Sequence, residues 1–174
     1  MTLTLAAKKV VVEEVAAAAS NAISAVLADY RGIPVNDMTA LRAKARAQGV
    51  YLRVVPNTLT RRAFDETPFA CLDDALKGPL VLALSMASPG DAARLLKDFA
   101  KSCDKLQIKA LALDGKAYGA EHLDAIASLP TRDEALATLM AVMKAPVEKF
   151  VRTLAAPHGK LVRTVVAIKD QKAS

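Results

Sequence analysis

Residues 23–55 have the sequence ISAVLADYRGIPVNDMTALRAKARAQGVYLRVV, which contains the strand–helix–strand pattern on which the predicted fold rests. The apolar run 23–27 predicts a buried strand, and the Asp-Tyr-Arg-Gly segment behind it predicts a turn. A helix is predicted from there to about residue 48, because apolar residues recur on one face at helical spacing. Gly49 ends that helix, and the alternating residues 50–55 predict a second strand.

The same alternation continues on both sides of this stretch. Further helices are predicted over residues 5–20, 57–64, 69–76, about 88–102 and 120–128, and further strands over 80–84 and 106–113. Helix caps are predicted at Asn36 or Asp37, at Asn57, and at Ser88 or Asp91. Strands separated by such helices are typical of an α/β domain. We therefore predict a four-stranded mixed sheet flanked by helices in domain 1–130, followed by an extended, kinked C-terminal helix in domain 131–174.

Composition narrows the class of protein. The chain has 174 residues, 53% hydrophobic and 4% aromatic, so small aliphatic side chains must build the core. No apolar run approaches 18 residues, which argues against a transmembrane helix, and the first residues do not resemble a signal peptide. These features predict a cytoplasmic protein. The distant pair Cys71 and Cys103 excludes a disulfide scaffold and a four-cysteine zinc site.

Positive charge is concentrated in two segments. Residues 31–64 carry seven basic residues against one acidic residue, and residues 138–174 carry seven against two. The segment 65–137 between them carries eight basic residues against twelve acidic ones. This asymmetry predicts two separate polyanionic or acidic partners, with two solvated faces as the plain alternative.

The tail repeats with a period of eleven residues. Residues 139–149, 150–160 and 161–171 are LMAVMKAPVEK, FVRTLAAPHGK and LVRTVVAIKDQ. Three helical turns take about 10.8 residues, so equivalent positions stay nearly in line, about 16 Å apart. The prolines at position eight of the first two blocks predict kinks. The apolar residues at positions one, two and five, predicted to bind a partner, are Leu139, Met140, Met143, Phe150, Val151, Leu154, Leu161, Val162 and Val165.

Two interpretations of the tail are possible: an amphipathic helix folded back on the domain, or a row of docking sites for identical helical partners. We favour the second, because packing on an irregular domain does not require the same residue types at the same phase. The positive charge of the tail predicts an acidic partner. Three blocks predict three partners, and two is the alternative because the first block lacks the Arg-Thr pair of the others.

Several segments together carry a family resemblance. They are Tyr30-Arg31-Gly32, Leu41-Arg42, Val-Val-Pro-Asn-Thr-Leu at 54–59 with Arg61-Arg62-Ala63, Gly78-Pro79, Leu-Pro-Thr at 129–131, and the Met-Lys-Ala-Pro and Val-Arg-Thr segments of the tail. In their order and spacing, over essentially the whole chain, they resemble the bacterial large-subunit ribosomal protein ten family, the stalk-base proteins.

The resemblance implies a structural role without catalysis. In that family the α/β domain binds large-subunit ribosomal RNA together with ribosomal protein eleven. The C-terminal helix binds dimers of the acidic stalk protein, the seven/twelve protein, and these recruit GTP-bound translation factors. Similar proteins also repress translation of their own messenger RNA, which stays open here as an alternative main role.

The predicted RNA-binding residues are Lys8, Arg31, Gly32, Arg53, Asn57, Thr58, Arg61 and Arg62. Most match the family's turn after the first strand and its Asn-Thr-Leu-x-Arg-Arg helix start. At that helix start, backbone N–H groups and the helix dipole favour phosphate. Pro56 departs from the family, which usually has a basic residue there. Because few aromatic residues lie nearby, recognition is expected to depend on RNA shape and backbone, and therefore on salt.

The sequence offers no catalytic or metal-binding motif. It contains no phosphate-binding loop and no nucleophile elbow, and neither His122 nor His158 has a companion at ligand spacing. We predict no enzymatic activity, no metal and no cofactor. Two rival classes remain: a small α/β enzyme with an amphipathic tail, and a basic membrane-surface α/β protein.

Overall fold

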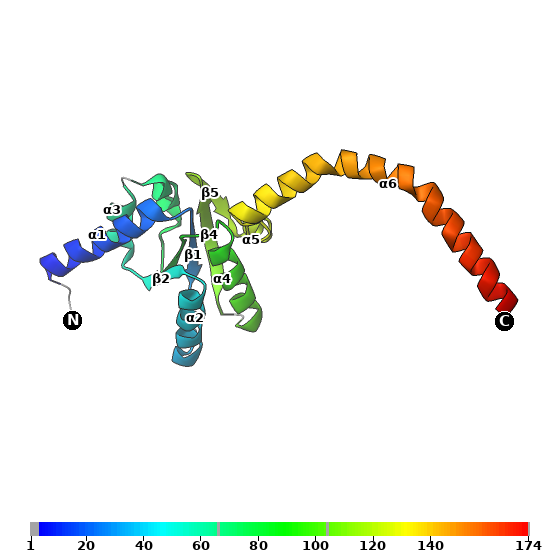
Figure 1. The fold of residues 1–174 in the computed structure, drawn as a ribbon. Helices are drawn as coiled ribbons and strands as arrows, with labels where there is room; N and C mark the ends of the chain where they lie inside the picture. The colour runs from blue at the N-terminus through cyan, green and yellow to red at the C-terminus, as the bar shows by residue number, and fades with distance from the viewer. Residues whose placement is uncertain (1–3, 66, 104, 174) are drawn as a thin grey trace. The chain divides into compact units, whose positions relative to one another are not determined.

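The computed structural model describes residues 4–65, 67–103 and 105–173. The chain divides into two compact units, Met1–Thr131 and Arg132–Ser174, called unit 1 and unit 2 below. Unit 1 combines a sheet with helices, and unit 2 is one long helix (Figure 1). The predicted α/β class with a long C-terminal helix is confirmed.

The elements follow one another much as the sequence predicts. The strands are β1 (Ser24–Asp29), β2 (Val50–Val54), β3 (Leu80–Ser85), β4 (Gln107–Leu113) and β5 (Lys116–Gly119). The helices of unit 1 are α1 (Leu5–Asn21), α2 (Val35–Ala47), α3 (Asn57–Phe64), α4 (Asp91–Ser102) and α5 (Leu123–Ala127), with 3-10 helices η1 (Pro68–Ala75) and η2 (Ala120–His122). Unit 2 contains α6 (Arg132–Ala173).

The sheet corrects the prediction of mixed strand directions. Its order is β2-β3-β1-β4-β5, and every neighbouring pair is antiparallel. The strands β1 and β2, joined by α2, do run in the same direction, but β3 lies between them. Similarly, β3 and β4, joined by α4, run in the same direction, and β1 lies between them. A helix between two strands therefore predicts their shared direction, but not which strand is inserted between them.

A fifth strand was missing from the prediction. Asp114 and Gly115 both have positive φ, at 50° and 76°, and they form a two-residue turn after which β5 pairs back on β4. Asp-Gly between strand segments is a strong hairpin signal, because two such residues suit a turn that matches strand twist. The dipeptide was predicted only as the end of a strand, so the predicted sheet stopped one strand early.

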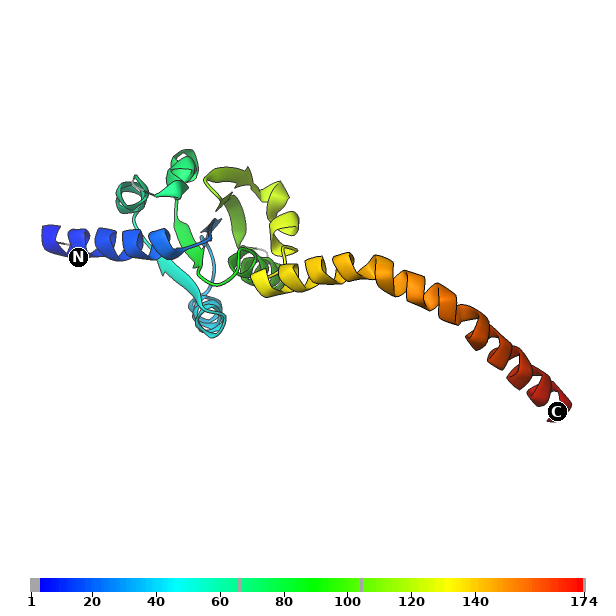
Figure 2. The same ribbon diagram turned by 45° about the horizontal axis from the view of Figure 1, so that its top comes forward.

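Helices cover both faces of the sheet (Figure 1, Figure 2). One face packs against α2 and α4, which bury Leu41 and Leu96, and the other packs against α1, α3 and η1, which bury Val15, Phe64 and Leu72. Because both faces are covered, β1 and β3 are continuous apolar runs instead of alternating ones. Because each helix turns its apolar face to the sheet, its charged residues lie on the opposite, outer face.

The predicted side-chain caps are wrong at three helices. At α4 the cap position is Gly90, not Ser88 or Asp91, and the helix has no side-chain cap hydrogen bond. Pro34 precedes α2 and Pro56 precedes α3, and neither helix has a side-chain cap hydrogen bond. The fixed φ of proline already prepares the first turn, so a capping side chain is not required. Asn57, predicted as a cap, is instead the first residue of α3, and its side chain donates to the carbonyl of Gly78 at 2.9 Å.

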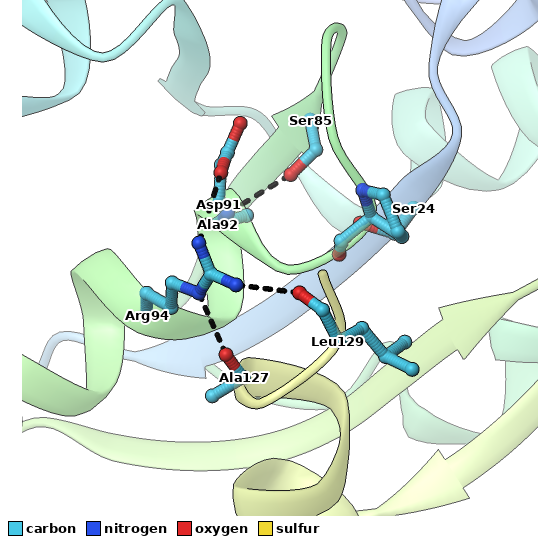
Figure 3. Close-up of polar contacts among 8 residues, drawn as sticks. Ser24, Ser85, Asp91, Ala92, Arg94, Ala127 and Leu129 are labelled. Atoms are coloured by element: carbon cyan, nitrogen blue, oxygen red, sulfur yellow. Dashed lines mark hydrogen bonds and ion pairs between the residues drawn. The ribbon is translucent and has the colours of Figure 1, made fainter. Parts of the chain in front are cut away.

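Arg94 on α4 binds the segment that ends unit 1 through hydrogen bonds to its backbone carbonyls. Its Nε donates to the carbonyl of Ala127 at 2.7 Å, and its Nη2 donates to the carbonyl of Leu129 (Figure 3). Gly90 lies against the same segment, where a Cβ would stand 3.0 Å from the carbonyl oxygen of Ile126. The arginine and the glycine together fix the end of α5 against the start of α4.

Replacing Arg94→Ala is expected to lower the free energy of unfolding by about 2 kcal/mol, because two carbonyls are deprived of charge-assisted donors. Urea denaturation measures the change. The control Lys101→Ala removes an exposed ion pair with Asp98 on the same helix. It is expected to lower the free energy of unfolding by less than about 0.5 kcal/mol. Equal effects of the two variants would contradict this role of Arg94.

Candidate nucleic-acid interface and docking helix

The turn after β1 presents Arg31 and Gly32, as predicted. Gly32 has a φ of +84°, a left-handed conformation that glycine adopts without strain. The N–H of Arg31 donates to Asp29 Oδ1 at 3.0 Å, and its side chain is exposed. The structure adds Lys105, whose Cδ would lie 3.6 Å from a Cβ at position 32. No local pattern pointed to Lys105, since only the fold brings it to this turn.

The start of α3 forms a second part of the surface. A cavity of about 570 Å³ is lined there by Tyr30, Val54, Val55, Pro56, Asn57, Thr58, Gly78, Pro79 and Leu80. The backbone N–H groups of Asn57 and Thr58 donate to no described residue, as expected for the first turn of a helix. Because Tyr30 adjoins Arg31, the fold brings the turn after β1 close to this helix start. Such a site can accept an anion.

The consecutive arginines of α3 lie on different sides of the helix. Arg61 Nη2 donates to the carbonyl of Asp73 at 3.2 Å, and Arg61 Nε lies 3.6 Å from Asp73 Oδ2. Arg62 instead borders a cavity of about 270 Å³ between α1 and α3, together with Lys8 and Lys9. Adjacent side chains on a helix diverge, so only Arg62 joins Lys8.

Arg53 does not join the other predicted RNA-binding residues. It projects from β2, where it donates to Glu14 of α1 and to the hydroxyl of Tyr51 at 3.2 Å. These two hydrogen bonds, that of Tyr51 first, raise the pKa of the guanidinium above its ordinary value. Arg53 borders a groove with Arg42 and Arg46, which were not among the predicted residues. The predicted RNA-binding set is therefore spread over several patches of unit 1.

The predicted docking residues of α6 are all exposed. Their exposed fractions range from 56% at Leu139 to 72% at Met143. The helix continues through Pro146 and Pro157 and bends along its length (Figure 1). Each proline removes one helical hydrogen bond, which accounts for bending without a break.

Unit 2 also exposes apolar residues that were not among the predicted docking residues: Leu136, Val142, Val147, Val166 and Ile168. Leu136 and Val147 are eleven residues apart and share position nine of the repeat. At about 100° per residue, this position falls on the same face as positions two and five. His158 and Lys169 occupy it in the later blocks, so the apolar stripe is widest at the start of the tail. The sequence signal for this wider stripe is the pair of apolar residues at position nine, Leu136 and Val147.

The second and third blocks share a local hydrogen bond. Thr153 Oγ1 donates to the carbonyl of Phe150 at 2.7 Å, and Thr164 Oγ1 donates to the carbonyl of Leu161 at 2.8 Å. Eleven residues separate both the donors and the acceptors. The repeat in sequence is thus a repeat in local structure.

Neither a metal-binding cluster nor a membrane-spanning helix is found in the described ranges 4–65, 67–103 and 105–173. Within them, no group of three or more His, Cys, Asp or Glu side chains could hold a metal ion. No helix in those ranges has the length and apolar character needed to cross a membrane.

An α/β unit with basic surface patches, followed by a long exposed helix, suits a structural component of a ribonucleoprotein particle. The model of the family described as Ribosomal protein L10 matches residues 3–101, and that of the Ribosomal protein uL10 C-terminal region matches residues 129–156. The large ribosomal subunit protein uL10 of Legionella pneumophila (strain Lens) is 68% identical over 173 residues, covering 99% of this chain and 98% of the relative. That of Alcanivorax borkumensis is 59% identical, covering 100% and 99%.

The chain belongs to the uL10 family of large ribosomal subunit proteins. The family resemblance predicted from the sequence is confirmed. The chain is a structural component of the large subunit, a particle built on ribosomal RNA, and it is bound to cytoplasmic ribosomes. It is not an enzyme.

Proposed function

We propose that this chain forms the base of the ribosomal stalk. In this proposal unit 1 binds large-subunit ribosomal RNA together with ribosomal protein eleven, and α6 binds dimers of the acidic stalk protein (seven/twelve). Those dimers in turn recruit GTP-bound translation factors. The observation that carries the proposal is the repeated row of exposed apolar residues on a basic helix.

The size of the stripe supports a partner that touches it at several points. Each block offers three predicted docking side chains, all more than half exposed. Their burial supplies roughly 3–5 kcal/mol per block, about the lower limit of the cost of association. Binding therefore needs further interactions, such as burial of Val147 at position nine of the first block and ion pairs between an acidic partner and the basic side chains of α6.

The width of the stripe bears on the number of dimers. The first block lacks the Arg-Thr pair, which favours two dimers, but Leu136 and Val147 widen its apolar face. We therefore favour three dimers, one for each of the segments 139–149, 150–160 and 161–171.

Native mass spectrometry of the chain co-expressed with the acidic stalk protein tests this number. We expect copies to be added in pairs, up to six, and truncation after Lys160 to remove one pair, because the third stripe is then absent. A full-length chain with Leu161, Val162 and Val165 changed to Ser is expected to behave like the truncation. As a control, Lys169→Gln with Lys172→Gln keeps the stripe and all three pairs. Unchanged stoichiometry after the truncation would overturn the repeat model.

The proposed RNA site is tested by Arg61→Ala combined with Arg62→Ala. We expect weaker binding to large-subunit ribosomal RNA. The slope of the logarithm of the binding constant against the logarithm of the salt concentration should also become shallower, by about 0.7–0.9 for each phosphate that the variant no longer neutralises. Loading of the acidic stalk protein is expected to stay unchanged, since that protein binds α6. Because Arg61 also holds Asp73, circular dichroism must show that the variant folds. Equal RNA affinity in a folded variant would contradict the assignment.

A further inference from the structure

A cationic groove lies between α2 and the edge strand β2. It has a volume of about 310 Å³ and is lined by Arg42, Ala45, Arg46, Val50, Leu52, Arg53 and Val54. The strand β2 stands at one end of the sheet and pairs only with β3 among the described strands. Its outer edge and the adjoining face of α2 together form the walls of the groove.

Two arginines of this groove have no side-chain partner within the described part of the chain. Arg42 and Arg46 are exposed, and neither side chain makes a hydrogen bond or an ion pair with any described residue. They are four residues apart, which places them on one face of α2 about 6 Å apart along the axis. Lys44 points elsewhere, since its Nζ lies 5.9 Å from the centre of the Phe99 ring.

The fold does not explain this pair of charges. Arg46 lies in the last turn of α2, where the helix dipole favours a cation, but that effect fades within one turn and does not reach Arg42. Like charges four residues apart repel each other by a few tenths of a kcal/mol on a helix. Leu41 of the Leu-Arg segment is fully buried in the core, whereas the Arg42 side chain is exposed and forms no ion pair within the described part of unit 1. The pair is therefore suited to an anion from outside the chain.

We propose that this groove binds the phosphodiester backbone of large-subunit ribosomal RNA, with Arg42 and Arg46 as its phosphate-binding residues and Arg53 at its border. This inference rests on the proposed RNA binding of unit 1 and extends it to a patch apart from the start of α3. The planar guanidinium group of arginine binds phosphate through two parallel hydrogen bonds.

The floor of the groove favours RNA over an acidic peptide. Val50 is only 5% exposed, Leu52 is half-buried and Val54 is 37% exposed. A bound peptide normally anchors itself with apolar side chains in a pocket, and little apolar surface remains here for such an anchor. Phosphates need only the two unpaired guanidinium groups.

The test compares two full-length variants of equal charge. Arg42→Gln with Arg46→Gln removes the proposed phosphate-binding groups, and Lys97→Gln with Lys101→Gln removes two positive charges from α4 as the control. The probe is the fragment of large-subunit ribosomal RNA that the wild-type chain protects from nuclease, titrated at several salt concentrations. We expect the groove variant to bind several-fold more weakly, with a salt slope smaller by about 1.5 because two phosphates are no longer neutralised, and the control to keep the wild-type slope. Thermal unfolding confirms that both variants fold.

Other outcomes would overturn the inference. Wild-type affinity and slope in the groove variant would exclude RNA from the groove. If that variant kept RNA binding but no longer bound ribosomal protein eleven or the acidic stalk protein, the groove would be a protein-docking site. If the Arg61 and Arg62 variant failed to bind RNA and the groove variant still bound it, this inference would fail while the proposed function stood. A wild-type chain that protected no fragment would overturn both.

Discussion

A single helix cannot bury its own apolar side chains, because burial needs a second surface packed against it. The proposed role of α6 as a docking helix depends on this constraint. The helix α6 leaves its nine predicted docking residues more than half exposed. Exposed apolar area of this extent is a liability unless another surface covers it. The proposed acidic dimers supply that surface, and the period of eleven residues places equivalent side chains at regular steps along the helix.

Unit 1 differs from α6 because it buries its apolar residues: helices cover both faces of its sheet. Small aliphatic residues in β1 and β3 lie between two layers of helices, and this leaves the charged residues of α2, α3 and β2 at the surface. Their positions follow from which face of the sheet each element covers. Arg62 and Lys8 meet between α1 and α3, whereas Arg42 and Arg46 border the edge of β2. The cationic surface is thus a consequence of the layered core.

Local patterns predicted the elements well, and non-local pairing explains most of the errors. The face of Met38, Leu41 and Ala45 is buried as its helical spacing indicates. The insertion of β3 between β1 and β2 depends on pairing between distant segments, and no local pattern encodes it. Similarly, the ion pair of Arg61 with Asp73 and the place of Lys105 beside Gly32 depend on loops that only the fold brings together. The hairpin at Asp114 is different, because the Asp-Gly pair that favours it is visible in the sequence itself.

Backbone hydrogen exchange along α6 tests whether the apolar stripe is an open docking surface. The full chain is measured alone and with saturating acidic stalk protein. In the chain alone, α6 amides are expected to exchange much faster than those of β1 and β3. Addition of the partner is then expected to slow exchange in all three segments 139–149, 150–160 and 161–171. If α6 were as protected as the buried strands without a partner, or gained no protection with it, the stripe would not be a docking surface.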